Sequence, residues 1–315
     1  MERNWERTLP FFYINRDIVN NLFRGLVDKE DILRIKPVDE GCRTSNYIID
    51  TSNDKKYILK IFFSQEQDYK KEHEILKIIR NKVPVQEICK FDKDDIIENK
   101  YYAIYKYVEG TTLSRSLQNT DIVGKSIIKD AASALAEIHR IKFKSIGFFD
   151  ENLNITVKLK PLDQWYGDFI NEKAGERLGR ELIEKIRILV DKSREELVNL
   201  DNDPRLVHGD FQGTNILIKE NRISGIIDWE FSMAGHPLAD IGQFFRYDEY
   251  FNEESISIFE EEYRKKSDYI LPENWYELSK VRDMVNLIQL LGFEEEMPNK
   301  YREIKSLIMK TINRC

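Results

Sequence analysis

One stretch of the chain carries most of the residues whose types and spacing could do chemistry. Residues 206–230 read LVHGDFQGTNILIKENRISGIIDWE and include His208, Asp210, Asn215 and Asp228. Carboxylate and carboxamide oxygens are hard ligands of the kind that hold Mg2+ beside phosphates. The stretch therefore predicts a site for a magnesium-bound nucleotide.

Two apolar runs are expected to position these polar residues. Residues 216–218 and 223–227 are separated by polar and charged residues, which is typical of two short paired strands joined by a turn. Such a hairpin puts Asp210 and Asn215 on the loop that enters one strand and Asp228 at the end of the next. The alternative is a solvated turn in which the Asp and Asn side chains bond only to nearby backbone.

A lysine far upstream favours the first interpretation. Lys60 lies in the strand-like run YILKIF with apolar neighbours on both sides, and a buried ammonium needs a counter-charge. The helix expected over residues 67–82 offers Glu72 and Glu74. Glu72 precedes Leu76 by four residues and shares its inner face, so we predict that Glu72 pairs with Lys60. The alternative for Lys60 is an edge-strand lysine in solvent.

The elements expected around Lys60 form a small sheet. A helix is predicted over residues 15–26, and strand-like runs cover residues 32–38, 46–50, 56–63, 87–91 and 101–108. The turn at residues 40–45 contains Gly41, Ser45 and other small polar residues, so its backbone N–H groups could lie against phosphates. An ordinary turn is the alternative for this segment.

The chain after Gly110 is expected to be mainly helical apart from the hairpin. A long amphipathic helix is predicted over residues 121–141, and His139 near its end is interpreted as a structural hydrogen-bonding residue. The sequence therefore predicts a five-stranded sheet with one or two helices followed by a mostly helical half. We place the boundary near Tyr107 to Gly110.

Composition limits the class of protein. A net charge of -7 and a pI of about 5.4 argue against a nucleic-acid binder, and they would suit a cationic ligand, although ordinary solubility explains the same charge. The scattered cysteines Cys42, Cys89 and Cys315 indicate a reducing, cytoplasmic setting. We expect no membrane span, because no apolar run is long enough. We also expect no signal peptide. The chain is expected to be a monomer or weak dimer.

Together these residues resemble the aminoglycoside phosphotransferase family of small-molecule kinases, which includes choline-kinase-like and homoserine-kinase-like relatives. The resemblance runs from roughly Val38 to Arg246 and rests on Lys60, Glu72, Gly110, HGDFQGTN and IIDWE. It implies an α+β, bilobal, protein-kinase-like fold. Residues 1–108 would form the nucleotide-binding lobe, with a five-stranded antiparallel sheet plus helices, and residues 109–315 the mostly helical catalytic and substrate-binding lobe.

The resemblance also implies a role for each residue at the nucleotide. Lys60 would touch the α and β phosphates of ATP or GTP while Glu72 holds it in place. Asn215 and Asp228 would ligate Mg2+, and Asp210 would accept or orient the proton of the acceptor hydroxyl.

Other residues would support these groups. His208 and Asp240 are expected to be structural, and Ser45 lies in the loop that would cover the phosphates. The base would contact backbone groups of Lys106 and Val108, which cannot distinguish ATP from GTP.

The acceptor is expected to be small, because the few residues between Asp228 and Asp240 leave no room for a peptide-binding segment. Acidic and aromatic residues of the helical half could hold a cationic acceptor, unless they only form a solvated face. These candidates are Asp163, Trp165, Tyr166 and Asp168, interpreted as one loop, with Asp248, Glu249, Glu294, Glu295 and Glu296.

The predicted function is phosphoryl transfer to a hydroxyl of a small molecule. The first expectation for the acceptor is an aminoglycoside or related antibiotic, and the second is homoserine, choline or another metabolite. A nucleotide-binding regulatory module without catalysis is an alternative of a different class. The intact set of Lys60, Asp210, Asn215 and Asp228 argues against that alternative, because a binder needs no base.

Overall fold

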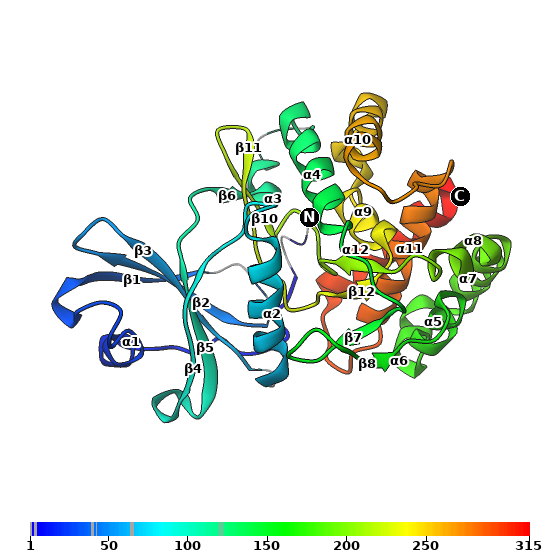
Figure 1. Ribbon diagram of the computed structural model, residues 1–315. Helices are drawn as coiled ribbons and strands as arrows, with labels where there is room; N and C mark the ends of the chain where they lie inside the picture. Colours follow the sequence, from blue (N-terminus) through cyan, green and yellow to red (C-terminus); the bar gives the residue numbers. More distant parts are fainter. Residues whose placement is uncertain are drawn as a thin grey trace.

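The chain folds into a sheet-rich part and a helix-rich part that lie side by side (Figure 1). This computed structural model describes residues 2, 5–38, 41, 43–63, 66–118, 120 and 122–315, without the side chains of residues 66–69. The predicted positions Glu40, Cys42 and Asp121 lie outside the described residues.

The first third of the chain builds a five-stranded antiparallel sheet in the order β1-β2-β3-β5-β4, which confirms the predicted sheet. Its strands are β1 (Ile32–Val38), β2 (Ser45–Thr51), β3 (Lys56–Ile61), β4 (Ile88–Asp94) and β5 (Lys100–Lys106). The accompanying helices are α1 (Arg16–Leu22) and α2 (Glu66–Ile79), with short 3-10 turns η1 (Lys29–Asp31) and η2 (Asp95–Ile97). Helix α1 ends earlier than predicted, and Gly25 follows it with a φ of 83°, where glycine meets no steric penalty.

The two faces of this sheet bury different cores because side chains alternate along a strand. One face packs Tyr47, Ile49 and Leu59 against Leu22 and Phe23. The opposite face carries Phe62, Ala103 and Tyr105 and joins α2 to the apolar core of the helix-rich part. Lys60 shares this second face and is 5% exposed, so it is a buried cation between the two parts.

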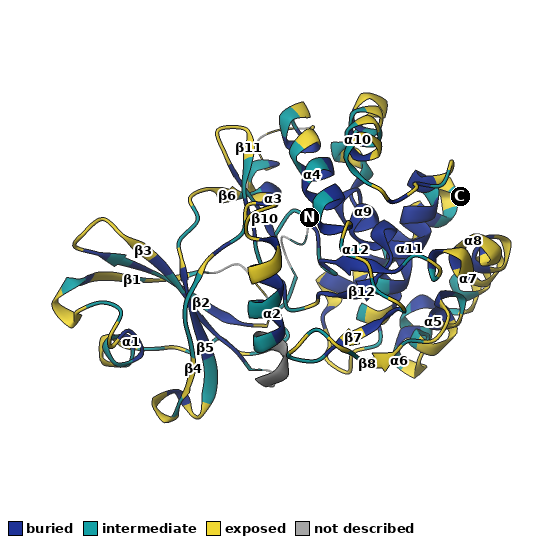
Figure 2. Ribbon diagram, in the orientation of Figure 1, coloured by how far each residue is buried: buried dark blue, intermediate teal, exposed yellow. Residues whose placement is uncertain are grey.

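The remainder of the chain is mainly helical. Its helices are α3 (Leu113–Ser116), α4 (Lys125–Ile138), α5 (Leu162–Phe169), α6 (Glu172–Leu178), α7 (Arg180–Lys192), α8 (Arg194–Leu200), α9 (Pro237–Phe244), α10 (Glu253–Lys266), α11 (Trp275–Leu290) and α12 (Pro298–Arg314), with the 3-10 turn η3 (Asp248–Tyr250). Helices α9 and α11 lie at the centre and are almost wholly buried, whereas α7 and α8 are exposed on their outer faces (Figure 2). Helix α9, in which every residue is buried, therefore forms part of the core of the helix-rich part.

Two small sheets interrupt these helices. The predicted hairpin is β10 (Ile216–Lys219) and β11 (Arg222–Ile226), and β6 (Thr111–Thr112) adds a third strand to it. A second sheet has the order β8-β7-β12-β9 and comprises β7 (Gly147–Phe149), β8 (Ile155–Lys158), β9 (Arg205–Val207) and β12 (Met233–Gly235). The sequence analysis missed this sheet, because strands of three or four residues are too short to show an alternating pattern.

None of the helices in the described part of the chain combines the length and apolarity that crossing a membrane requires.

Candidate active site

Asp210 and Asn215 lie on the loop between β9 and β10, where the sequence predicted them. The Asn215 amide Nδ2 donates to the Asp210 backbone oxygen at 2.9 Å and to its carboxylate Oδ2 at 2.7 Å. Gly209 has a φ of 81°, and a Cβ there would lie 2.3 Å from the Phe231 carbonyl oxygen. The chain can therefore turn into Asp210 only with glycine at this position.

Asp240 on α9 stabilises this loop through hydrogen bonds to its backbone. Its fully buried carboxylate accepts the backbone N–H groups of His208 at 2.8 Å and Gly209 at 2.9 Å. The third contact is His139 Nε2, 3.2 Å from Asp240 Oδ2. Since Tyr263 Oη lies 2.7 Å from His139 Nδ1, a proton on Nε2 lets His139 donate to Asp240 and accept from Tyr263. Asp240 is thus fully satisfied and fixes the backbone directly before Asp210.

His208 connects the two halves of the hairpin. Its Nδ1 accepts the Asp210 backbone N–H at 3.2 Å, so Nε2 carries the proton and donates to the Ile227 carbonyl at 3.0 Å. Burial lowers the pKa of His208, which keeps the ring neutral for these two bonds. The spacing between Asp210 and Asp228 is therefore set by one imidazole ring.

Asp228 of the helix-rich part forms an ion pair with Lys60 of the sheet-rich part. Asp228 has a φ of 68°, an uncommon left-handed conformation for a non-glycine residue, and its Oδ1 lies 2.6 Å from Lys60 Nζ. Burial disfavours the charged lysine, but the carboxylates of Asp228, Glu72 and Glu230 outweigh it and raise the pKa of Lys60. Lys60 therefore stays cationic at neutral pH.

The predicted ion pair between Lys60 and Glu72 is not formed in the described structure. Glu72 is 1% exposed, and its Oε1 accepts the Tyr105 hydroxyl at 3.1 Å. Its Oε2 has no hydrogen-bond partner among the described residues, and burial raises the pKa of this carboxyl. The difference arises because the ammonium is directed at Asp228 Oδ1, 2.6 Å away, while Glu72 is bonded to Tyr105.

Two residues beside this pair escaped the sequence analysis. Glu230 follows Asp228 by two residues, and burial together with the Asp228 charge raises the pKa of its carboxyl to about 7. Arg43, in the loop between β1 and β2, lies 5.4 Å from the centre of the Phe231 ring. Glu230 is part of the motif IIDWE, so the sequence could have identified it. The position of Arg43 depends on the contact of the loop with Phe231, which the sequence does not show.

Ser45 does not offer its hydroxyl to the cleft as predicted. The side chain is fully buried, and its Oγ accepts the Phe12 backbone N–H at 2.8 Å. The physical reason is register, because Ser45 begins β2 on the face that packs inward, opposite Ile61.

The link between the two parts of the chain lies against the hairpin. Gly110 has a φ of 150°, and a Cβ there would lie 2.9 Å from the Ile218 carbonyl oxygen. The Ser224 hydroxyl donates to the Glu109 carbonyl at 2.7 Å, and Val108 packs on Gly225. The Lys106 N–H donates to the Glu87 carbonyl at 2.9 Å, whereas no described backbone acceptor takes the N–H of Val108.

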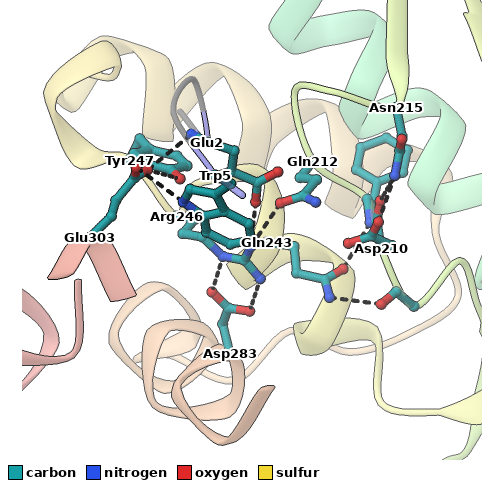
Figure 3. Close-up of polar contacts among 12 residues, drawn as sticks. Glu2, Trp5, Asp210, Gln212, Asn215, Gln243, Arg246, Tyr247, Asp283 and Glu303 are labelled. Atoms are coloured by element: carbon teal, nitrogen blue, oxygen red, sulfur yellow. Dashed lines mark hydrogen bonds and ion pairs between the residues drawn. The ribbon is translucent and has the colours of Figure 1, made fainter. Parts of the chain in front are cut away.

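Arg246 and its partners form the side of the site next to Asp210 (Figure 3). Arg246 Nε and Nη2 donate to the two oxygens of Asp283, both at 2.8 Å, and Nη1 donates to Gln212 Oε1 at 2.7 Å. Nη1 also lies 3.4 Å from Glu2 Oε1, and the Glu2 side chain is 11% exposed. The sequence analysis missed both Arg246 and Glu2, because their partners lie far away along the chain.

Burial raises the pKa of Asp210 to about 7, and the Arg246 charge only partly offsets it. The folded protein therefore holds a proton on Asp210 at pH values where the unfolded chain has lost it. Protonation of Asp210 therefore adds to the free energy of unfolding. This contribution is complete below a pH of about 4 and is lost as the pH rises through about 7.

We accordingly expect Asp210→Asn to melt above the wild type at pH 8, measured without metal or nucleotide. The gap should be on the order of 10 °C, because a pKa raised from 3.8 to about 7 corresponds to roughly 4 kcal/mol, and about 1 kcal/mol shifts Tm by roughly 2–4 °C in domains of 150–250 residues. It should close near pH 4, where both side chains are neutral. Glu2 and Glu230 are present in both proteins and cancel in the difference. Equal melting temperatures at pH 8 would contradict the raised pKa.

The polar residues at the cleft fit Mg2+ beside phosphates. The Asn215 amide donates through Nδ2, which leaves its Oδ1 for a cation, and Asp228 and Glu230 add carboxylate oxygens. No group of three or more His, Cys, Asp or Glu side chains in the described part of the chain could hold a metal ion alone. Because Mg2+ is usually bound by one or two carboxylates together with substrate phosphates, this donor set suits a metal that arrives with a nucleotide.

The structure differs from the predicted acceptor group in residues 163–168, which form helix α5 instead of a loop. Trp165 is buried and donates through Nε1 to the Lys160 carbonyl at 2.7 Å. The Tyr166 hydroxyl is buried and donates to the Val281 carbonyl at 2.6 Å. Asp168 pairs with Lys160 at 2.8 Å. The aromatic residues are thus part of the core, because the helical spacing turns them inward.

The other acidic candidates form ion pairs or are exposed. Asp163 lies 3.7 Å from Arg194, and Glu249 pairs with Lys310 at 2.9 Å. Asp248 is held by Lys280, and its Oδ2 lies 3.2 Å from Arg314. The side chains of Glu294, Glu295 and Glu296 are exposed. None of these side chains, as far as the described residues go, contacts Asp210, Asn215 or Asp228.

Comparison with known proteins places this site within a family. The model of the phosphotransferase enzyme family matches residues 34–273. Among curated proteins, acyl-CoA dehydrogenase family member 11 of Pongo abelii is 25% identical over 169 residues, which is 51% of this chain and 20% of the relative. The probable acyl-CoA dehydrogenase IBR3 of Arabidopsis thaliana is 26% identical over 180 residues, 54% of this chain and 22% of the relative. The match therefore covers about a fifth of the length of these relatives.

Solved structures share the fold over almost the whole chain. The GDP complex of aminoglycoside 2'-phosphotransferase-IIIa has a TM-score of 0.73 and 15% identity, and covers 95% of this chain and 97% of that chain. Choline kinase LicA from Streptococcus pneumoniae has a TM-score of 0.65 and 20% identity, covering 95% and 99%. A thermostable mutant of aminoglycoside phosphotransferase APH(4)-Ia, in a ternary complex with ADP and hygromycin B, has a TM-score of 0.66 and 14% identity, covering 95% and 97%.

Proposed function

Since the chain belongs to the phosphotransferase enzyme family, a family of small-molecule kinases, we propose that it moves the γ-phosphate of ATP or GTP to a hydroxyl of a small molecule. The observation that carries this proposal is the ion pair between Lys60 of the sheet-rich part and Asp228 of the helix-rich part, together with the bond between Asn215 and Asp210. In this proposal residues 1–108 bind the nucleotide, and residues 109–315 supply the catalytic loop and the acceptor site.

At the nucleotide, Lys60 is the cation for the α and β phosphates, and Glu72 keeps negative charge beside it. The unpartnered Glu72 Oε2 is placed to accept from the ammonium once Lys60 turns from Asp228 to the phosphates. Asn215 Oδ1, Asp228 and Glu230 are the residues that would hold Mg2+, which neutralises phosphate charge when bound. The backbone of Lys106 and Val108 would meet the base, so neither ATP nor GTP is selected by a side chain.

At the acceptor, Asp210 takes the proton of the substrate hydroxyl. The hydroxyl oxygen then bonds to the γ-phosphorus, and the bond between the γ-phosphorus and the oxygen that bridges it to the β-phosphate breaks. A base whose pKa lies near 7 is well matched to this task at neutral pH. Asn215 orients the Asp210 carboxylate through its 2.7 Å bond, and Asp240 and His208 fix the backbone beneath it. Most of the catalytic effect then comes from positioning and charge neutralisation.

For the acceptor, an aminoglycoside or related antibiotic remains the first candidate, since two of the similar structures are aminoglycoside phosphotransferases, one bound to GDP and the other to ADP and hygromycin B. A hydroxylated metabolite is the second, because choline kinase LicA has the higher sequence identity of 20%. A cytoplasmic setting and a monomer or weak dimer remain predictions.

Thermal melting with nucleotides tests the proposal directly. We expect Mg-ATP or Mg-GTP at 100 times Kd to raise Tm by about 5–10 °C, because such binding stabilises the folded state by about 2.7 kcal/mol. Hygromycin B, choline and homoserine should then be compared as acceptors by nucleoside diphosphate release. A chain that no Mg-nucleotide stabilises would overturn the proposed function.

A further inference from the structure

Residues 5–14, called the strap below, run between the Asp210 side of the site and the loop between β1 and β2. They belong to no helix or strand, yet their polar atoms are bonded to both parts of the molecule. Figure 3 shows Trp5 of the strap and the nearby Glu2 beside Arg246, with Gln212 between this group and Asp210. None of the catalytic roles described above uses these residues.

One end of the strap is fixed to the helix-rich part. Trp5 Nε1 donates to Glu303 Oε2 at 3.1 Å, and the Lys300 ammonium lies 4.9 Å from the Trp5 ring centre. The Glu6 carboxylate accepts the backbone N–H groups of Asn299 at 3.0 Å and Lys300 at 3.2 Å, at the start of α12. Desolvation raises the pKa of Glu6, but these charge-assisted bonds at a helix N-terminus outweigh it and lower the pKa.

The same end contacts Arg246 through the nearby Glu2. The Glu2 backbone N–H donates to Glu303 Oε1 at 3.0 Å, and its carboxylate lies 3.4 Å from Arg246 Nη1. Asp210 is one of the charges that act on Glu2. An acceptor approaching Asp210 along this side would therefore meet Glu2 and Trp5.

The other end of the strap is fixed to the loop above the cleft. Arg7 donates to the backbone carbonyl of Gly41 through Nη1 and to that of Thr44 through Nη2, the latter at 2.8 Å. Further along, the Phe12 N–H donates to Ser45 Oγ at 2.8 Å, and the Tyr47 hydroxyl donates to the Phe12 carbonyl at 2.6 Å. The strap is thus bonded to the loop and to the first residues of β2.

We infer that the strap couples the acceptor side of the site to the loop over the phosphates. Glu6 and Arg7 are consecutive residues, one bonded to α12 and the other to the loop, so neither end can shift by a few ångströms without moving the other. An acceptor that displaces Glu2 and Trp5 would pull on the loop, and a nucleotide that moves the loop would act on the acceptor side. Only the names "acceptor side" and "loop over the phosphates" rest on the proposed function, and the coupling itself does not.

Amide hydrogen exchange tests the coupling in the full chain without any ligand. Releasing the α12 end with Trp5→Phe and Glu6→Gln together should speed exchange of the amides at residues 43–46 by about 3-fold or more. Releasing the loop end with Arg7→Gln should speed exchange at Asn299 and Lys300 to a similar degree.

Each variant has a matched control. Glu249→Gln removes a carboxylate that is paired with Lys310 of α12 but lies off the strap. Arg16→Gln removes a guanidinium that donates to the carbonyls of Ile32 and Leu33, in the same manner as Arg7 but on the far side of β1. Neither control should change exchange at the distant end. Changes confined to the released end, or equal changes in the controls, would overturn the coupling.

Mg-AMP-PNP supplies a second readout. Its binding should protect residues 43–46 and also Asn299 and Lys300 in the wild type, and Arg7→Gln should lose the second effect alone. Protection that never reaches α12 would count against the strap. Absence of any binding would overturn the proposed function instead, while the exchange results without ligand would still decide the coupling.

Discussion

Asp210→Asn is expected to lower kcat by about 10³-fold while leaving nucleotide affinity within roughly threefold of wild type. The amide is isosteric and can still accept from Asn215 Nδ2, so the loop keeps its geometry. It cannot take the proton of an acceptor hydroxyl, so the loss falls on the chemical step. Single-turnover transfer from radiolabelled ATP or GTP, together with calorimetric titration of the nucleotide, measures the two quantities separately.

Asp191→Asn is the matched control, because Asp191 is exposed on α7 and pairs only with Arg194 among the described residues. It should leave both kcat and nucleotide affinity unchanged. Transfer at more than a tenth of the wild-type rate by Asp210→Asn would rule out Asp210 as the base. Loss of nucleotide binding in that variant would mean that Asp210 acts on the cofactor rather than on the acceptor.

The second large effect is expected at Asp240, a residue that touches no substrate. Asp240→Ala should destabilise the protein by about 3–5 kcal/mol, because it leaves the His208 and Gly209 N–H groups and the His139 ring without their buried acceptor. A loss of that size lowers Tm by on the order of 10 °C. Urea denaturation and thermal melting check the value.

Asp240→Asn separates hydrogen bonding from charge. The amide oxygen can replace only part of the acceptor capacity, so its Tm should lie between those of the wild type and Asp240→Ala. Asp203→Ala is a surface comparison, since Asp203 pairs with Arg205, which keeps Asp268 as a second partner. A fall in Tm of less than about 2 °C for Asp240→Ala would show that the loop does not depend on this brace.

Asp210 and Asp240 show how much of the site could be predicted from the sequence. Asp210, Asn215 and Asp228 were predicted together because a hairpin of paired apolar runs brings both ends of one segment to the same place. Asp240 was predicted as structural from the resemblance to the family, and its contacts with His208 and Gly209 agree with that role. In each case the interacting residues lie within one continuous stretch of the chain.

The residues on the acceptor side could not be predicted from the sequence. Trp165 and Tyr166 look like ligand-binding aromatics in sequence, yet their helix turns them into the core. Glu2 and Arg246 attract no attention in sequence, yet they lie beside Asp210, more than 200 residues apart in the chain. Acidic and aromatic residues are common on any helical surface, so their local pattern carries little information about which of them face a pocket.

Alternation, turn residues and helix periodicity are local properties of the chain, and they were sufficient to predict the sheet, the hairpin and the polar residues of the loop between β9 and β10. The pairing of Lys60 with Asp228 instead of Glu72, and the connection of α12 with the loop between β1 and β2 through residues 5–14, could not be predicted in this way. The physical reason is that ion pairing depends on distances between elements, which local pattern leaves open. Packing of the two parts of the chain sets those distances, and with them the charge that each side chain meets.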